Sequence, residues 1–119
     1  MQKLFTSVIL LSMLVLVSCN GKTSASIENK SPNEKAVIKI TASRSNVLDA
    51  FKTEISVKAY DFKEGKLSFE ISADDLNAEN VKFRWLDDNN CIITIEERDK
   101  HVRSFQLIAS ESQVQLAEI

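Results

Sequence analysis

Apolar residues alternate with polar ones through most of the chain after Lys35, and this period of two constrains the fold more than any other feature. In the first such segment, Ala36, Ile38 and Ile40 occupy alternate positions, which predicts a strand near residues 35–42. Successive side chains of a strand point to opposite faces of its sheet, so this pattern buries one face and leaves the other solvated. An all-β fold with antiparallel pairing is therefore expected.

The next two alternating segments, 54–62 and 66–72, predict a hairpin. A three-residue loop at 63–65, with Gly65 in the left-handed conformation, fixes its register. Apolar residues then face each other and opposite charges meet, as a preferred register requires. The predicted pairs are Ala59 with Phe69, Val57 with Ile71 and Lys58 with Glu70.

Three later strands, near 81–87, 91–98 and 102–109, satisfy the same test as a meander with one apolar face. Their predicted loops are 88–90 and 99–101. The predicted pairs are Trp85 with Ile93, Phe83 with Ile95, Lys82 with Glu96, Ile93 with Leu107, Cys91 with Ala109 and Glu97 with Arg103.

The remaining segments are less regular. Residues 113–119 predict a last strand of open register, and 73–80 a loop or a single helical turn. Residues 46–52 fit either one helical turn with Asn46 as N-cap or an irregular strand. We expect about seven antiparallel strands in a sandwich or a curved meander sheet, with at most one short helix near 46–53. An α+β sheet covered by a helix is the alternative.

The N-terminal segment follows a different pattern. Lys3 precedes fourteen uncharged, mostly apolar residues, Leu4–Val17. A membrane-spanning helix needs about 20 such residues, so residues 1–18 predict a cleaved export signal that takes no part in the fold. The run ends in Leu16-Val17-Ser18-Cys19 and continues with polar residues.

This junction resembles the lipobox of bacterial lipoproteins, in which a branched apolar residue and two small or medium residues precede an obligatory cysteine. The resemblance implies that Cys19 receives a diacylglyceryl group, that cleavage falls between Ser18 and Cys19, and that the new N-terminus is acylated. Because Asn20 is not the aspartate associated with inner-membrane retention, it favours an outer membrane facing the periplasm. No family is recognised for residues 35–119.

Composition limits the partners of the mature chain. Residues 1–18 hold one Lys and no acidic residue, so the rest carries 14 Lys and Arg against 17 Asp and Glu, a net charge near −3. This balance argues against nucleic acid. With Cys19 lipidated, Cys91 has no partner for an internal disulfide. Residues 20–34 are polar and predict a flexible tether between the lipid and a single domain at 35–119.

One candidate partner surface lies on the reverse face of the predicted meander. The registers place Leu86 beside Ile92 and Ile92 beside Ile108, and a three-residue final loop adds Val114 to this apolar row. Either the first strand or residues 46–53 cover the row, or it is an exposed stripe that docks a partner.

Other chemically notable residues have structural explanations. We expect Trp85 and Cys91 to be buried, although Trp85 could instead stack on a sugar and Cys91 could pair between chains. His101 belongs to a hairpin tip, and a lone histidine makes no zinc site. The acidic groups Asp87–Asn90 and Asp74, Asp75 and Glu79 fit turn chemistry rather than calcium binding or acid–base catalysis. A basic group at one hairpin tip could contact lipid headgroups or cell-wall polymer; its members are Arg98, Lys100, His101 and Arg103.

No nucleophile, base and metal cluster comes together in this pattern, so the sequence predicts no enzyme, no cofactor and no metal site. It favours a lipid-anchored binding or assembly module of the cell envelope, with a possible protein partner. A periplasmic inhibitor or immunity-type protein, which would block an enzyme with a hairpin loop, is the alternative.

Overall fold

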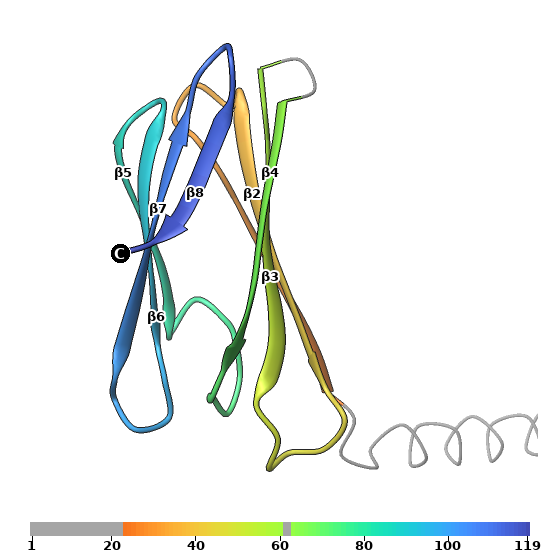
Figure 1. Cartoon of the computed structure of the whole chain (residues 1–119). Helices are drawn as coiled ribbons and strands as arrows, with labels where there is room; N and C mark the ends of the chain where they lie inside the picture. Colours follow the sequence, from red (N-terminus) through yellow and green to blue (C-terminus); the bar gives the residue numbers. More distant parts are fainter. Residues whose placement is uncertain (1–22, 61–62) are drawn as a thin grey trace, which may run out of the picture.

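The computed structural model describes residues 23–60 and 63–119, which form two four-stranded antiparallel sheets packed face to face (Figure 1). Sheet A consists of β1 (Thr23–Lys30), β2 (Ala36–Arg44), β3 (Phe51–Ala59) and β4 (Lys63–Ile71). Sheet B consists of β5 (Val81–Asp87), β6 (Asn90–Glu96), β7 (Val102–Ala109) and β8 (Val114–Glu118). Strand order follows chain order in both sheets, so each is a meander. The predicted all-β sandwich is confirmed, with eight strands rather than about seven and no helix among the described residues.

The core lies between the sheets and is built from the alternate apolar positions of the strands. Burial alternates along β2 and β6 as the period of two predicts. Each such aliphatic or aromatic side chain contributes about 1.5–3 kcal/mol when fully buried. The largest fully buried side chains are Phe51, Phe105, Ile38, Ile40, Ile55, Ile71, Ile93, Ile95 and Leu107.

Strand β1 lies within the segment predicted as a tether. It pairs with β2 along its whole length, from Thr23 opposite Arg44 to Lys30 opposite Val37. The tether prediction is therefore wrong for residues 23–30, which belong to the folded domain that was predicted to start at residue 35. Alternation in β1 is carried mostly by small side chains, with Ile27 the only large apolar one, so the sequence pattern of this strand is weak. The predicted signal, Ser18, Cys19 and the rest of the tether up to residue 22 lie outside the described residues.

The β3–β4 register differs from the predicted one. Phe51 faces Ile71 and Thr53 faces Phe69, because residues 63–65 belong to β4 and do not form the loop. Gly65 lies inside β4 instead of in the loop. A Cβ added at Gly65 would lie 2.7 Å from Cγ1 of Val114 in β8. Glycine is thus needed where the two sheets approach each other, not for a left-handed turn.

Both registers of the sheet B meander differ from the predicted ones by two residues, which preserves the inward face. A bulge between Trp85 and Asp87 shortens the first turn, and the second connection is longer than predicted, spanning residues 97–101. Lys100 in that connection adopts a left-handed φ of 71°. The observed pairs are Trp85 with Cys91, Phe83 with Ile93, Lys82 with Thr94, Cys91 with Leu107, Ile93 with Phe105 and Ile95 with Arg103.

The two irregular segments are both loops at one end of the sandwich. Residues 45–50 join β2 to β3 without a helix: the Asn46 side chain accepts a hydrogen bond from the backbone N–H of Leu48 at 2.9 Å, and the chain then enters β3. Residues 72–80 cross from sheet A to sheet B as a loop, as predicted, and bury Leu76 against the core. The last strand is confirmed as β8, where Val114 faces Ala109 and packs inward.

A buried arginine holds this end together. Arg44, at the end of β2, is 8% exposed and its guanidinium lies 4.1 Å from the centre of the Phe51 ring. It donates hydrogen bonds to the carbonyl oxygens of Ala73 and Asp74, at 2.8 and 2.9 Å. The Arg44 side chain therefore connects β2 and β3, the two strands on either side of the 45–50 loop, to the crossing loop at 72–80.

Candidate functional site

The predicted row on the outer face of sheet B is present only in part. Leu86 is 55% and Ile108 37% exposed, and Ile92 is half-buried. Ile92 faces Arg84 and Gln106 rather than Leu86 and Ile108, because the bulge and the longer loop shift both registers. The prediction of a contiguous apolar row is therefore wrong, and Leu86, Ile92 and Ile108 lie among polar residues.

The two segments expected to cover this face lie elsewhere. Strand β2 and the 45–50 loop belong to sheet A, on the opposite layer of the sandwich (Figure 1). Val114, which would have extended the row, packs into the core. The outer face of sheet B thus stays exposed to solvent at Leu86 and Ile108, and its role as a partner surface remains a prediction.

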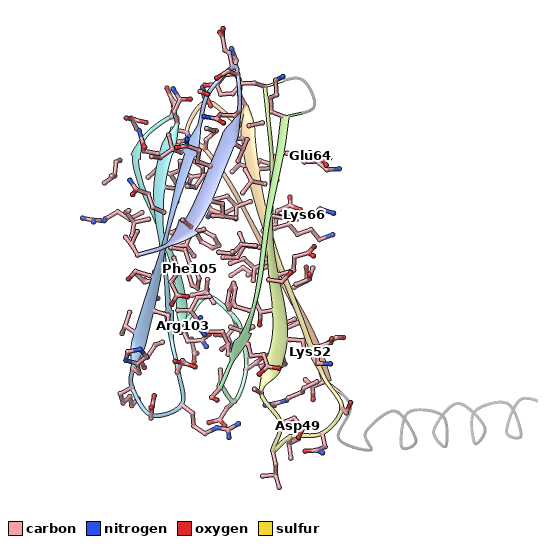
Figure 2. All side chains as sticks on the ribbon, viewed as in Figure 1. Asp49, Lys52, Glu64, Lys66, Arg103 and Phe105 are labelled. Atoms are coloured by element: carbon pink, nitrogen blue, oxygen red, sulfur yellow. The ribbon has the colours of Figure 1, made fainter. Side chains whose placement is uncertain are left out.

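The outer face of sheet A forms a shallow depression of about 940 Å³, lined mostly by residues of polar type, that the sequence did not suggest. Figure 2 shows Lys52, Glu64 and Lys66 projecting from this side of the molecule, away from sheet B. Short hydroxyl side chains from three strands leave the space between the longer charged ones. The outward residues that line it are Ser24, Ser26, Thr41, Ser43 and Ser68, with Lys39, Lys52, Glu54 and Glu70. Its hydroxyl and charged side chains offer hydrogen bonds.

The basic residues of the β6–β7 tip do not form a free cationic surface. Arg98 donates to Asp74 at 2.8 Å and to the carbonyl oxygens of Ala73 and Val47 at 3.2 and 3.4 Å. Lys100 lies 3.5 Å from Glu96. Most of this positive charge is therefore paired with acidic groups or backbone carbonyls of neighbouring loops.

Arg103, the fourth member of the group, lies in β7 rather than in the loop. It forms a two-pronged pair with Glu118, with donor–acceptor distances of 2.8 and 2.9 Å, and not the predicted pair with Glu97. Its guanidinium also lies 5.1 Å from the centre of the Phe69 ring and donates to the carbonyl of Glu70. The hydrogen bonds from Arg103 lower the pKa of Glu118. This pair links β7 and β8 to the end of β4.

The acidic groups act in turns, as predicted. The Asp87 carboxylate accepts hydrogen bonds from the backbone N–H of Asn89 at 2.7 Å and from the side chain of Asn90, and these bonds lower the pKa of Asp87. Asp75 accepts from the backbone N–H of Leu76 at 2.8 Å in the crossing loop. Within residues 23–60 and 63–119, no three His, Cys, Asp or Glu side chains lie close enough to hold a metal ion.

Cys91 is fully buried on the inward face of β6, as predicted, although it faces Leu107 rather than Ala109. Burial raises the pKa of its thiol to about 11. A protonated thiol inside the core can neither attack a disulfide nor meet a second chain. The alternative of an intermolecular disulfide is therefore wrong for the folded protein.

Trp85 is half-buried and packs against the core, which agrees with the prediction of a core anchor. Its indole N–H donates to the Asn29 side-chain oxygen at 2.7 Å. Because Asn29 belongs to β1 and Trp85 to β5, this hydrogen bond joins an edge strand of sheet A to an edge strand of sheet B. His101 is exposed in the β6–β7 connection, as predicted.

Comparison with known proteins adds no family to this geometry: no protein-family model matches the chain, and no curated protein or solved structure is similar to it. Across the described part of the chain, no helix has the length and apolar character needed to cross a membrane.

Proposed function

We propose that this protein is a bacterial lipoprotein of the cell envelope, in which a lipid on Cys19 anchors a β-sandwich that acts as a binding or assembly module. The anchor follows from the sequence of residues 1–19: a basic start, an apolar run of fourteen residues and a cysteine directly after a small residue. Two or three acyl chains hold a protein on a bilayer stably, since each buried methylene contributes about 0.8 kcal/mol. Asn20 supports an outer-membrane location facing the periplasm.

The position of β1 is consistent with this proposal and sharpens it. Thr23 already pairs with Arg44, so three residues separate it from Cys19. Fully extended, the four peptide units between them span at most about 14 Å. The domain therefore stands close to the bilayer rather than at the end of a long tether.

The proposed working surface is the outer face of sheet B, where Leu86, Ile92 and Ile108 offer apolar contacts within a polar surround. Isolated apolar residues are common on protein surfaces, so a protein partner is the part of the proposal that most needs a test. Catalysis and cofactor binding are not part of it, because the candidate histidine and acidic residues serve in turns.

The anchor is tested by replacing Cys19 with Ser in cells grown with labelled palmitate. The wild-type chain should incorporate label and sediment with membranes, whereas Cys19→Ser should lose the label and be released or accumulate as precursor. Cys91→Ser is the matched control and should keep its label, because that thiol is not the attachment point. Unchanged membrane retention of Cys19→Ser would overturn the lipoprotein assignment.

The partner surface is tested by crosslinking in intact cells. Ile92→Ser with Ile108→Ser should leave the fold intact, because both side chains point outward, and should abolish a specific crosslinked product. Thr94→Ser, on the same face, is the control. If the variant folds and the crosslinked products do not change, this face is not the working surface.

A further inference from the structure

An apolar pair stands at the tip of the β2–β3 loop, in contact with solvent. Leu48 is 84% and Val47 54% exposed, the first being the most exposed large apolar side chain of the described residues. The basic tip that the sequence suggested for lipid contact does not include them. Figure 1 shows this loop extending beyond its neighbours at its end of the molecule, and Figure 2 places Asp49 there.

The loop is held rather than loose. The Asn46 side chain accepts from the backbone N–H of Leu48, and the Asn46 carbonyl accepts from the N–H of Asp49 at 3.2 Å. Arg98 donates to the carbonyl of Val47 at 3.4 Å. Below the loop, Arg44 stacks on Phe51 and fixes both strands that carry it. The two apolar side chains are thus presented from a supported tip.

The chain path places this tip beside the proposed lipid. Thr23 pairs with Arg44, the last residue before the loop, and neighbouring strands lie about 4.8 Å apart. Since Cys19 can be at most about 14 Å from Thr23, the bilayer that holds the acyl chains lies next to the base of the loop. Of the two ends of the sandwich, only the one carrying Val47 and Leu48 can face the membrane at that distance.

We propose that Val47 and Leu48 insert into the headgroup and acyl boundary of the bilayer that carries the anchor, as a second, apolar membrane contact that orients the sandwich. This inference rests on the proposed lipidation of Cys19. The basic side chains Arg98 and Lys100 at this end of the sandwich are paired with Asp74 and Glu96, so attraction to anionic lipid does not drive the contact. Insertion is apolar, and the expected contact is insensitive to salt and present on neutral lipid.

The test uses the full-length, lipidated protein carrying Leu48→Cys, labelled with an environment-sensitive fluorophore and reconstituted into phosphatidylcholine vesicles. Cys91 is buried and Cys19 is blocked by lipid, so the label goes to residue 48. Glu111→Cys, exposed in the β7–β8 connection at the opposite end of the sandwich, is the matched control. Vesicle flotation reports the anchor, and quenching by lipids with a nitroxide high on the acyl chain reports the loop.

The label at 48 should shift to shorter wavelength on reconstitution, and its quenching should exceed that at 111 by roughly two-fold or more. Adding phosphatidylglycerol or salt should change neither value. Floating vesicles with a label at 48 that stays as aqueous and unquenched as at 111 would overturn the insertion and leave the anchor standing. Failure of the protein to float would overturn both. Unchanged Trp85 emission confirms that each variant is folded.

Discussion

Gly65 gives the sharpest test of how the two sheets meet. A Cβ at this position would lie 2.7 Å from Cγ1 and 3.3 Å from Cβ of Val114, with the Val114 carbonyl oxygen at 3.6 Å. Valine has few alternative χ1 rotamers, so Gly65→Ala forces strands β4 and β8 apart. Overpacking of this kind costs about 1–3 kcal/mol, and the lower entropy of the unfolded chain offsets about 0.4–1 kcal/mol of it.

We therefore expect Gly65→Ala to lower the free energy of unfolding by about 1–2 kcal/mol. A Val114→Ala background removes the 2.7 Å contact with Cγ1 and leaves only the 3.3 Å contact with Cβ, so the same change should there cost less than about 0.5 kcal/mol once the unfolded-chain entropy is included. The loss of most of the destabilisation is the expected signature, and it corresponds to a coupling energy of about 1–2 kcal/mol, within the range for residues in contact. Urea unfolding followed by the fluorescence of Trp85, the only tryptophan, measures all four free energies.

The outward-facing Ser68→Ala on the same strand serves as the control and should change stability by less than about 0.5 kcal/mol. If Gly65→Ala destabilised the protein equally with and without the Val114 methyl groups, the glycine would be required for another reason. The proposed close approach of β4 and β8 would then be refuted.

Three further predictions concern two hydrogen-bonded pairs between strands and the buried thiol. The pKa of Glu118 is lowered in the folded state, so Glu118 stabilises the protein above its unfolded-state pKa of about 4.3, and this contribution is lost as pH falls through the folded-state pKa. Glu118→Gln should lower the free energy of unfolding by only about 0.5 kcal/mol at neutral pH, because the ion pair is partly solvated. Unfolding of both proteins measured across an acid titration checks that their difference in stability disappears at low pH. Burial raises the pKa of Cys91, so the contribution of the protonated thiol to stability is present below a pH of about 8.5 and is lost as pH rises toward about 11. A thiol reagent should modify Cys91 only as fast as the protein unfolds. Rapid labelling of Cys91 in the native protein would contradict its burial. Asn29→Ala removes the acceptor of the Trp85 indole and should cost about 1 kcal/mol, with no added loss in a Trp85→Phe background, as measured by thermal unfolding followed by circular dichroism.

The faces of the sandwich could be predicted from sequence because they depend only on the parity of apolar positions. Cys91, Ile93 and Ile95 point inward whichever residues they pair with, so an error of two residues leaves the buried face unchanged. The pairings themselves depend on turn lengths. A bulge after Trp85 and a five-residue connection at 97–101 could not be read from Asn and Asp residues that suit many turns.

Contacts between residues that are distant in the sequence were the second limit on what could be predicted. Gly65 suggested a turn by composition, but its neighbour Val114 is distant in sequence, and only the packing of β4 on β8 explains the glycine. Asn29 and Arg44 look like surface residues until Trp85 and the crossing loop are placed beside them. For the candidate sites, sequence correctly placed His101 and the acidic groups in turns, but it could not show that neutralising partners for Arg98 come from another loop.

The crossing loop at 72–80 has a consequence for how the molecule could be divided. Among the described residues it is the one connection between the sheets, and every strand pair is formed on one side of it or the other. A protease that cuts there leaves two fragments with all their strand pairs intact and no peptide bond between them. Each fragment alone would expose one apolar face, so the halves should behave as a split protein that regains its structure only by reassociation.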